Sequence, residues 1–276
     1  MERILLFGTM GEIGPTVHSH LAERGYEVSL VDFPQNVLHD EWGYCRLLRK
    51  SISALRPDAV MPIGNSIAIS RAKSSLQSEF PGLAVCVEDE RKVALLDSKV
   101  RLYALAESLG IRQPRLYRSE DELPPDGQTV IFKRDVSFGG QGVHMPISRK
   151  AIGNLIAHQR AGEPYLLEEY LIGTDWSIDT VRSAGRIHAS AYRCTSGIGR
   201  NGPSTERVIE DRPELLGVAV KVLEELDYIG VCGFDFKVTE DGRAYLLEAN
   251  PRFTGGIATQ IEAGFDIPAL LLEAWL

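Results

Sequence analysis

The stretch that decides the fold is Gly233-Phe234-Asp235-Phe236-Lys237, a polar turn over residues 239–243, and then Ala244-Tyr245-Leu246-Leu247-Glu248-Ala249-Asn250-Pro251-Arg252. Two apolar runs that flank a Glu-Asp-Gly turn predict a β-hairpin. Asp235 falls on the first strand, while Glu248 and Asn250 lie two residues apart on the second and point to one face. Mg²⁺ prefers such oxygen ligands and completes its shell with water and phosphate oxygens. The hairpin therefore predicts a Mg²⁺ site at Asp235, Glu248 and Asn250, with a nucleoside triphosphate as partner.

Acidic residues on a hairpin are more often solvated or salt-bridged than bound to a metal. Here the first strand is apolar at Val231, Phe234 and Phe236, which indicates an interior sheet. Carboxylates on such a sheet are unfavourable unless a cation or hydrogen bonds compensate them, so the metal interpretation is favoured. Arg252 follows on the same face and is suited to a phosphate or carboxylate.

The composition restricts the class of partner. The chain has 276 residues, is 44% hydrophobic, carries a formal charge of −8 and has a pI near 5.4. An acidic protein is a poor general ligand for nucleic acid or anionic membranes, so neither is expected as a partner. The four cysteines have no paired spacing, and no apolar run reaches transmembrane length, which predicts reduced thiols and a cytoplasmic location.

Residues 1–95 alternate apolar strands with helices, which predicts a parallel sheet covered on both faces, an α/β Rossmann-like domain. A helix is expected over residues 97–110, and then a second block of strands in α+β arrangement. The strands expected in that block span residues 129–133, 143–146, 165–170, 176–182, 186–194, 231–237 and 244–249. A last helix begins near Pro268 and includes Leu276, and it leaves residues 269–276 as a candidate surface for a homodimer.

The second motif is Ile131-Phe132-Lys133, followed by a turn over residues 137–142 that holds three glycines. Glycines let backbone N–H groups approach phosphate oxygens, and the lysine neutralises their charge. The turn is not a Walker A motif, because no Gly-Lys-Ser/Thr opens a following helix. An ordinary glycine hairpin is the alternative, and the metal hairpin downstream favours a flexible lid over a triphosphate.

The third motif is Tyr165-Leu166-Leu167-Glu168-Glu169-Tyr170-Leu171-Ile172-Gly173-Thr174-Asp175. An apolar strand that ends in a turn presents backbone groups to an adenine edge, and flanking leucines enclose the ring. Asp175, just after the turn, is suited to ribose hydroxyls.

Together these elements resemble the ATP-grasp superfamily, particularly the carbamoyl-phosphate-synthetase-like and D-alanine–D-alanine-ligase-like carboxylate–amine ligases. The resemblance implies a Rossmann-like pre-ATP-grasp domain at residues 1–95, a linking helix and small subdomain with the lid at 96–170, and a C-terminal subdomain with the Mg²⁺ site at 171–276. The two ATP-grasp subdomains are each of the α+β class. Two departures from the family pattern stand out: an extra residue between Asp97 and Lys99, and Arg134 where proline is frequent. Asp235 occupies a position at which family members vary.

By this resemblance, ATP and Mg²⁺ are the cofactors, with Mn²⁺ as an alternative metal. The residues expected to bind ATP are Lys99, Lys133, Ser137, Gly139, Gly140, Gln141, Gly142, Glu168, Glu169, Tyr170, Leu171 and Asp175. Lys133 and Arg252 are expected to stabilise the transferring phosphoryl group. Arg193, Arg200 and Arg207 are candidates for gripping an acceptor carboxylate, and Arg193 is taken as the catalytic one.

The function implied is an ATP-dependent ligase that activates a carboxylate as an acylphosphate and couples it to an amine, with an amino acid or small peptide-like acid as substrate. Two alternatives stay open. One is a non-catalytic ATP-binding protein. The other is a short-chain-type dehydrogenase that uses the turn with Gly8, Gly11 and Gly14 and the acidic Asp32. Such dehydrogenases need a tyrosine followed four residues later by lysine, and none of the nine tyrosines has one.

Overall fold

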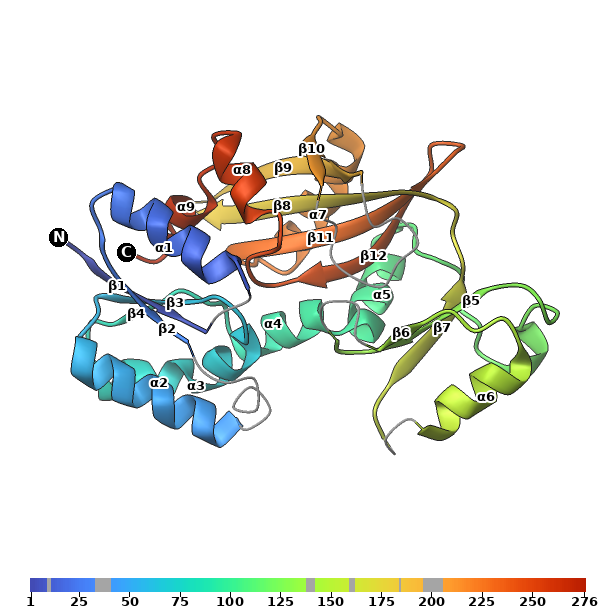
Figure 1. Cartoon of the computed structure of the whole chain (residues 1–276), viewed down its shortest axis with the longest axis horizontal. Helices are drawn as coiled ribbons and strands as arrows, with labels where there is room; N and C mark the ends of the chain where they lie inside the picture. The colour runs from blue at the N-terminus through green and yellow to red at the C-terminus, as the bar shows by residue number, and fades with distance from the viewer. Residues whose placement is uncertain (9–10, 33–40, 138–141, 159–161, 184, 196–205) are drawn as a thin grey trace.

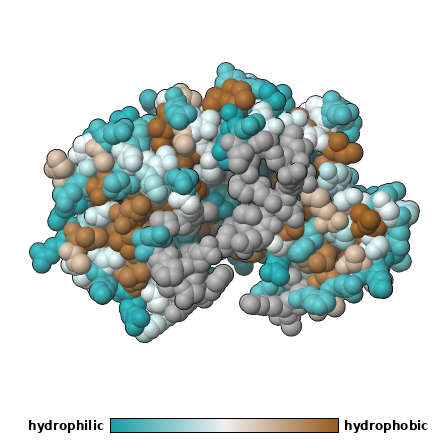
Figure 2. All heavy atoms as spheres, viewed as in Figure 1, coloured by the Kyte–Doolittle hydropathy of each residue, from teal (hydrophilic) through white to brown (hydrophobic). Residues whose placement is uncertain are grey.

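The computed structural model describes residues 1–276 except residues 9–10, 33–40, 138–141, 159–161, 184 and 196–205 (Figure 1). Three sheets follow one another along the chain. No helix in the described ranges is long and apolar enough to cross a membrane. Figure 2 shows hydrophilic residues interspersed with smaller hydrophobic patches over the described part of one face.

The first sheet is parallel, as the alternation of strands and helices predicted. Its strands β1 (Arg3–Phe7), β2 (Glu27–Val31), β3 (Ala59–Pro62) and β4 (Ala84–Val85) lie in the order β2-β1-β3-β4. Helix α1 (Ile13–Glu23) covers one face, where Ile4 and Leu6 are buried, and α2 (Glu41–Leu55) and α3 (Ser66–Glu79) cover the other, where Leu5 and Phe7 are buried (Figure 1). The apolar residues of β1 thus alternate between two separate cores.

Two helices connect this sheet to the rest of the chain, where one had been predicted. Helix α4 (Glu90–Asp97) ends before Ser98, which is extended with φ −89° and ψ 115°, and α5 (Lys99–Ser108) begins directly after it. The Ser98 hydroxyl caps α5 by accepting a hydrogen bond from the Arg101 N–H at 3.2 Å. Serine competes well for such backbone groups, which is why it ends one helix and starts another. The helix predicted over residues 97–110 corresponds to α5, whereas α4 before it was not predicted.

The second sheet is a small antiparallel one in the order β6-β5-β7, built from β5 (Val130–Arg134), β6 (Val143–His144) and β7 (Tyr165–Glu169). Helix α6 (Arg149–His158) packs against it, and Leu123, Val130 and Ile152 form its separate small core. A short 3₁₀ turn at Glu120–Glu122 precedes it.

The third sheet is antiparallel in the order β10-β9-β8-β11-β12. Its strands are β8 (Gly173–Ser183), β9 (Arg186–Cys194), β10 (Arg207–Ile209), β11 (Gly230–Thr239) and β12 (Ala244–Asn250), and its helices are α7 (Pro213–Glu225), α8 (Ile257–Glu262) and α9 (Ile267–Glu273). The predicted hairpin is confirmed as β11 and β12. Helix α9 ends at Glu273 rather than continuing through Leu276, and Leu271 and Leu272 are buried against the protein's own chain. The homodimer contact expected at residues 269–276 stays a prediction.

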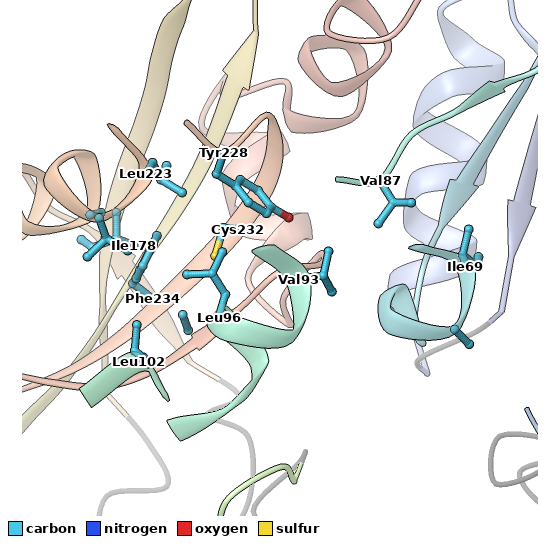
Figure 3. Packing of buried hydrophobic residues seen from close by; sticks show 14 of the residues in the cluster. Ile69, Val87, Val93, Leu96, Leu102, Ile178, Leu223, Tyr228, Cys232 and Phe234 are labelled. Carbon is cyan, nitrogen blue, oxygen red and sulfur yellow. The ribbon is translucent and has the colours of Figure 1, made fainter. Parts of the chain in front are cut away.

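One hydrophobic core joins the first and third sheets. In Figure 3, Ile178, Cys232 and Phe234 of the third sheet face Leu96 of α4 and Leu102 of α5. Their cluster also includes Val93, Val87 and Ile69, so it continues into the first sheet. Burial of this surface therefore fixes α4 against α3 and β12, and α5 against α4 and β12. Helix α5 carries a predicted ATP-binding lysine, Lys99, at its first residue.

Candidate functional site

The hairpin brings the three predicted metal ligands together. Asp235 is paired with Glu248, and Gly233 is paired with Asn250. A register shift follows between Asp235 and Phe236, as in a β-bulge. The Asn250 amide nitrogen donates to Asp235 Oδ2 at 3.2 Å, and the Ser177 hydroxyl on β8 donates to Asp235 Oδ1 at 2.5 Å.

The two carboxylates differ in their electrostatic environment. Burial, and then the negative charge of Glu248, raise the pKa of Asp235. Burial acts in the same direction on Glu248, but the ammonium groups of Lys99 and Lys133 outweigh it and lower the pKa of Glu248. A metal cation placed between Asp235 and Glu248 would relieve the repulsion between the two carboxylates.

The donor set fits a hard divalent cation. Among the described residues, no group of three or more His, Cys, Asp or Glu side chains could hold a metal ion, so a site here depends on the amide oxygen of Asn250 together with Asp235 and Glu248. Carboxylate and amide oxygens suit Mg²⁺, which leaves its remaining positions to water and phosphate. Asn250 Oδ1 also accepts a hydrogen bond from Arg252 Nη2 at 2.7 Å, which places the guanidinium beside the predicted ligands.

Lys99 enters the cluster from the first turn of α5. Its ammonium lies 3.1 Å from Glu248 Oε2 and donates to the Ser137 hydroxyl and to the Asp135 carbonyl, each at 3.4 Å. The preceding Ser98 donates to the Asp135 carboxylate at 2.8 Å. The extra residue in Asp97-Ser98-Lys99 thus ties the start of α5 to the segment after β5.

Lys133 reaches the cluster from the opposite sheet. The buried Lys133 ammonium forms an ion pair with Glu168 Oε1 on β7, which pairs with β5. Tyr103 of α5, which sequence reasoning missed, donates from its hydroxyl to Glu168 Oε2 at 2.9 Å. Its position one turn after Lys99 is the signal that could have revealed it.

The other predicted hinge residues do not join this cluster. Glu169 Oε1 accepts a hydrogen bond from the Arg115 N–H at 2.9 Å, so this side chain faces the segment before the small sheet. Tyr170 is exposed, Leu171 is half-buried, and Asp175 forms an ion pair with Lys237 of β11.

The predicted lid is described only at its two ends. Ser137 contacts Lys99, and Gly142 has φ +79°, where a Cβ would approach Arg134 Cδ to 2.9 Å. Glycine is therefore required at that end of the turn. Gly139, Gly140 and Gln141 lie outside the described residues.

Arg193 lies apart from the cluster of lysines and carboxylates. The side chains of the site, such as Ser177 and Asp235, alternate along their strands with those of the hydrophobic core, and Arg193 is paired with the core residue Trp176. The Arg193 guanidinium binds Glu210 at 2.7 Å instead of facing the carboxylates. Side-chain alternation along β9 places it on the opposite face. Arg200 lies outside the described residues.

Arg207 lies on the same face of the five-stranded sheet as the carboxylate cluster. Its guanidinium stands over the Tyr192 ring at 5.8 Å, and Tyr192 is paired with Ser177. No carboxylate within the described part of the chain forms a salt bridge with Arg207.

The segment after β12 packs closely onto the same face. A Cβ on Gly233 would meet Thr254 Cγ2 at 2.2 Å, so the missing side chain permits this approach. The Thr254 hydroxyl donates to Asp179 Oδ1 at 2.8 Å, and burial raises the pKa of Asp179 to about 6. Neither Asp179 nor Thr254 belonged to the predicted site.

A five-stranded antiparallel sheet and a small three-stranded sheet, with a cluster of lysines and carboxylates between them, are typical of the ATP-grasp fold. Residues 161–276 match the family model described as ATP-grasp in the biosynthetic pathway with Ter operon.

Two solved structures show the same fold over the chain. The biotin carboxylase domain of 2-oxoglutarate carboxylase from Hydrogenobacter thermophilus, in complex with MgADP, ADP and bicarbonate, is 16% identical with a TM-score of 0.75, covering 99% of this chain and 69% of that one. An L-amino acid ligase from Bacillus licheniformis is 15% identical with a TM-score of 0.73, covering 98% of this chain and 73% of that one.

A relative detected by sequence is the arginine-specific large chain of carbamoyl phosphate synthase from Geobacillus stearothermophilus. It is 25% identical over 207 residues, which are 70% of this chain and 20% of the relative. The chain thus spans a fifth of the length of that relative. The predicted resemblance to the ATP-grasp ligases is confirmed by these matches.

Proposed function

We propose that this protein is an ATP-dependent carboxylate–amine ligase that activates a carboxylate as an acylphosphate, couples it to an amine, and releases ADP and phosphate. The observation that carries the proposal is the convergence of two lysines from different elements near Glu248 of the hairpin. Lys99 forms an ion pair with Glu248, and the charge of Lys133, which is itself paired with Glu168, also lowers the pKa of Glu248. Cations and oxygen ligands at one place are what a magnesium-bound triphosphate needs.

ATP and Mg²⁺ are the proposed cofactors. Asp235, Glu248 and Asn250 would hold the metal, and Lys99 and Lys133 would bind phosphate oxygens. Support comes from the MgADP bound to the similar biotin carboxylase domain. When bound, the nucleotide supplies the phosphoryl group, and the metal neutralises part of its charge.

The chain itself contributes positioning and charge. Arg252 is held by Asn250 beside the metal ligands, where its guanidinium would stabilise negative charge on the transferring group. The segment over 137–142 would cover the phosphates and exclude water, which protects an acylphosphate from hydrolysis. A protein nucleophile is not needed for this reaction.

For the acceptor carboxylate we propose Arg207 in place of Arg193. Arg207 lies on the face that carries Asp235, whereas Arg193 is neutralised by Glu210 on the other face. An amino acid or small peptide-like acid is the proposed substrate, and the structural likeness to an L-amino acid ligase supports this choice.

The domain assignment is part of the proposal: a Rossmann-like domain at 1–95, the linking helix and small subdomain at 96–170, and the C-terminal subdomain at 171–276. The first boundary falls within α4 (Glu90–Asp97). Since α4 packs against α3 of the first unit and against β12 of the third sheet, it contacts both units.

Phosphate release tests the proposal. The protein is incubated with Mg·ATP and an array of amino acids, with Glu248→Ala as the inactive variant and Glu240→Ala, in the exposed turn of the same hairpin, as the matched control. We expect release that depends on an amino acid, its loss in Glu248→Ala and its retention in Glu240→Ala. A dehydrogenase or a non-catalytic binder would release none.

A further inference from the structure

Tyr103 connects three parts of the molecule. It lies on α5, one turn after Lys99, and its side chain is only 2% exposed. Its hydroxyl contacts Glu168 Oε2 on β7 at 2.9 Å and the Leu247 carbonyl on β12 at 3.2 Å. One hydroxyl thus bridges the small sheet and the strand that carries Glu248.

The hydroxyl has one proton and two acceptors. Since a carboxylate is a stronger acceptor than a neutral carbonyl, Glu168 takes the hydrogen bond. Glu168 is 1% exposed, and its described side-chain partners are Tyr103 and Lys133. The charge of this buried carboxylate is therefore compensated by one ammonium and one hydroxyl.

The proposed function requires the Lys133 ammonium to turn toward a phosphate. Glu168 would then keep a single donor, the Tyr103 hydroxyl. A buried charge without any hydrogen-bond donor is strongly unfavourable. The free-energy cost of moving the Lys133 ammonium away from Glu168 therefore depends on whether the Tyr103 hydroxyl still donates to that carboxylate.

We propose that Tyr103 is a positioning residue for Lys133: it holds Glu168 in place as the resting partner of the lysine and keeps that carboxylate hydrogen-bonded when the lysine moves to the phosphates. This inference rests on the proposed function. The Tyr103 hydroxyl contacts Glu168 and the Leu247 carbonyl and no side chain of a proposed metal ligand, so it acts through Glu168.

Paired binding measurements test the inference. Isothermal titration with Mg·ATP and with adenosine is performed on the wild-type chain and on Tyr103→Phe, which keeps the buried ring. We expect ATP to bind about 10- to 100-fold more weakly to the variant, since one hydrogen bond to a charge is lost, while adenosine affinity stays within about twofold. Adenosine has no phosphate for Lys133, so a merely structural defect would weaken both ligands.

The variant Glu168→Gln provides a second test, which does not require Tyr103→Phe to fold. It removes the anion that competes for Lys133, so ATP should bind at least about threefold more tightly relative to adenosine. In the Glu168→Gln background, Tyr103→Phe should change ATP affinity by less than about threefold, because no buried charge remains to be compensated.

Equal ATP affinity of wild type and Tyr103→Phe, or an equal loss for ATP and adenosine, would overturn the role of Tyr103. Unchanged or weaker ATP binding in Glu168→Gln would overturn it as well. A wild-type chain that binds no Mg·ATP would instead overturn the proposed function, on which this inference depends.

Discussion

The two faces of the five-stranded sheet differ sharply although the same strands build them. One face carries Ser177, Asp179, Tyr192, Asp235, Glu248 and Asn250, and the other carries Trp176, Ile178, Ala191, Cys232, Phe234 and Phe236. The second set packs on α4, α5 and α7 (Figure 3). Because successive side chains of a strand alternate, each strand contributes to the core and to the candidate site at once.

Because the two faces alternate residue by residue, substitutions at neighbouring positions of β8, β9 or β11 should affect either stability or activity, but not both. Pairs of substitutions, one on each face of the sheet, therefore test whether the two faces have separate roles.

The largest effect is expected on the polar face. Glu248→Gln should lower kcat/KM for amino-acid-dependent phosphate release by roughly 10³-fold, since it removes a metal ligand and a partner of Lys99. Circular dichroism should show an unchanged fold. Turnover close to that of the wild type would remove Glu248 from the metal site.

Phe234→Ala, on the core face, should mainly reduce stability rather than remove a residue of the candidate site. Phe234 is fully buried, so the substitution should lower the free energy of unfolding by about 3–5 kcal/mol. Urea denaturation measures this change. A loss under about 1 kcal/mol would mean that this face is not the main core.

Asp179 makes the polar face sensitive to pH. Its folded pKa, raised by burial from 3.8 to about 6, lies above the unfolded value. The stability it contributes is therefore fully present below pH 3.8 and is lost as the pH rises to about 6.

Relative to Asp179→Asn, the wild-type free energy of unfolding should fall by about 3 kcal/mol between about pH 3 and pH 7, because each unit of the pKa shift corresponds to about 1.4 kcal/mol. Urea denaturation of both proteins at several pH values gives this difference. A constant difference across that range would contradict the raised pKa.

The two arginines provide the smallest and most selective comparison. Arg207→Ala should raise KM for the acceptor about 10- to 100-fold, because one charged contact to a carboxylate is lost. Arg193→Ala should leave KM within about twofold and cost about 0.2–1 kcal/mol of stability, since its ion pair with Glu210 is partly exposed. Equal effects of the two substitutions on KM would show that Arg193 and Arg207 do not differ in their role toward the acceptor.

Much of the fold could be predicted from local patterns. The alternation of strands and helices predicted the parallel sheet, and two apolar runs around Thr239–Arg243 predicted the hairpin of β11 and β12. Helix α4 was missed, and only the structure shows that it ends at Ser98, whose hydroxyl donates to the Asp135 carboxylate.

The candidate site was predictable where its residues share one hairpin. Asp235, Glu248 and Asn250 lie together because register and alternation suffice to place them. Contacts between distant elements were not predictable. The sequence places Tyr103 one turn after Lys99, but it does not identify Glu168 as the partner of Tyr103 or Glu210 as the partner of Arg193. Arg193 and Arg207 look alike in sequence, and only strand pairing separates them by face.

The most direct test of the central claim is a crystal structure with Mn²⁺ and ADP, read by the anomalous signal of the metal. The account predicts a peak bound by Glu248 and Asn250, with the ADP phosphates beside Lys99 and Lys133. A metal peak elsewhere, or ADP bound next to β1 with the hairpin cluster unoccupied, would contradict it.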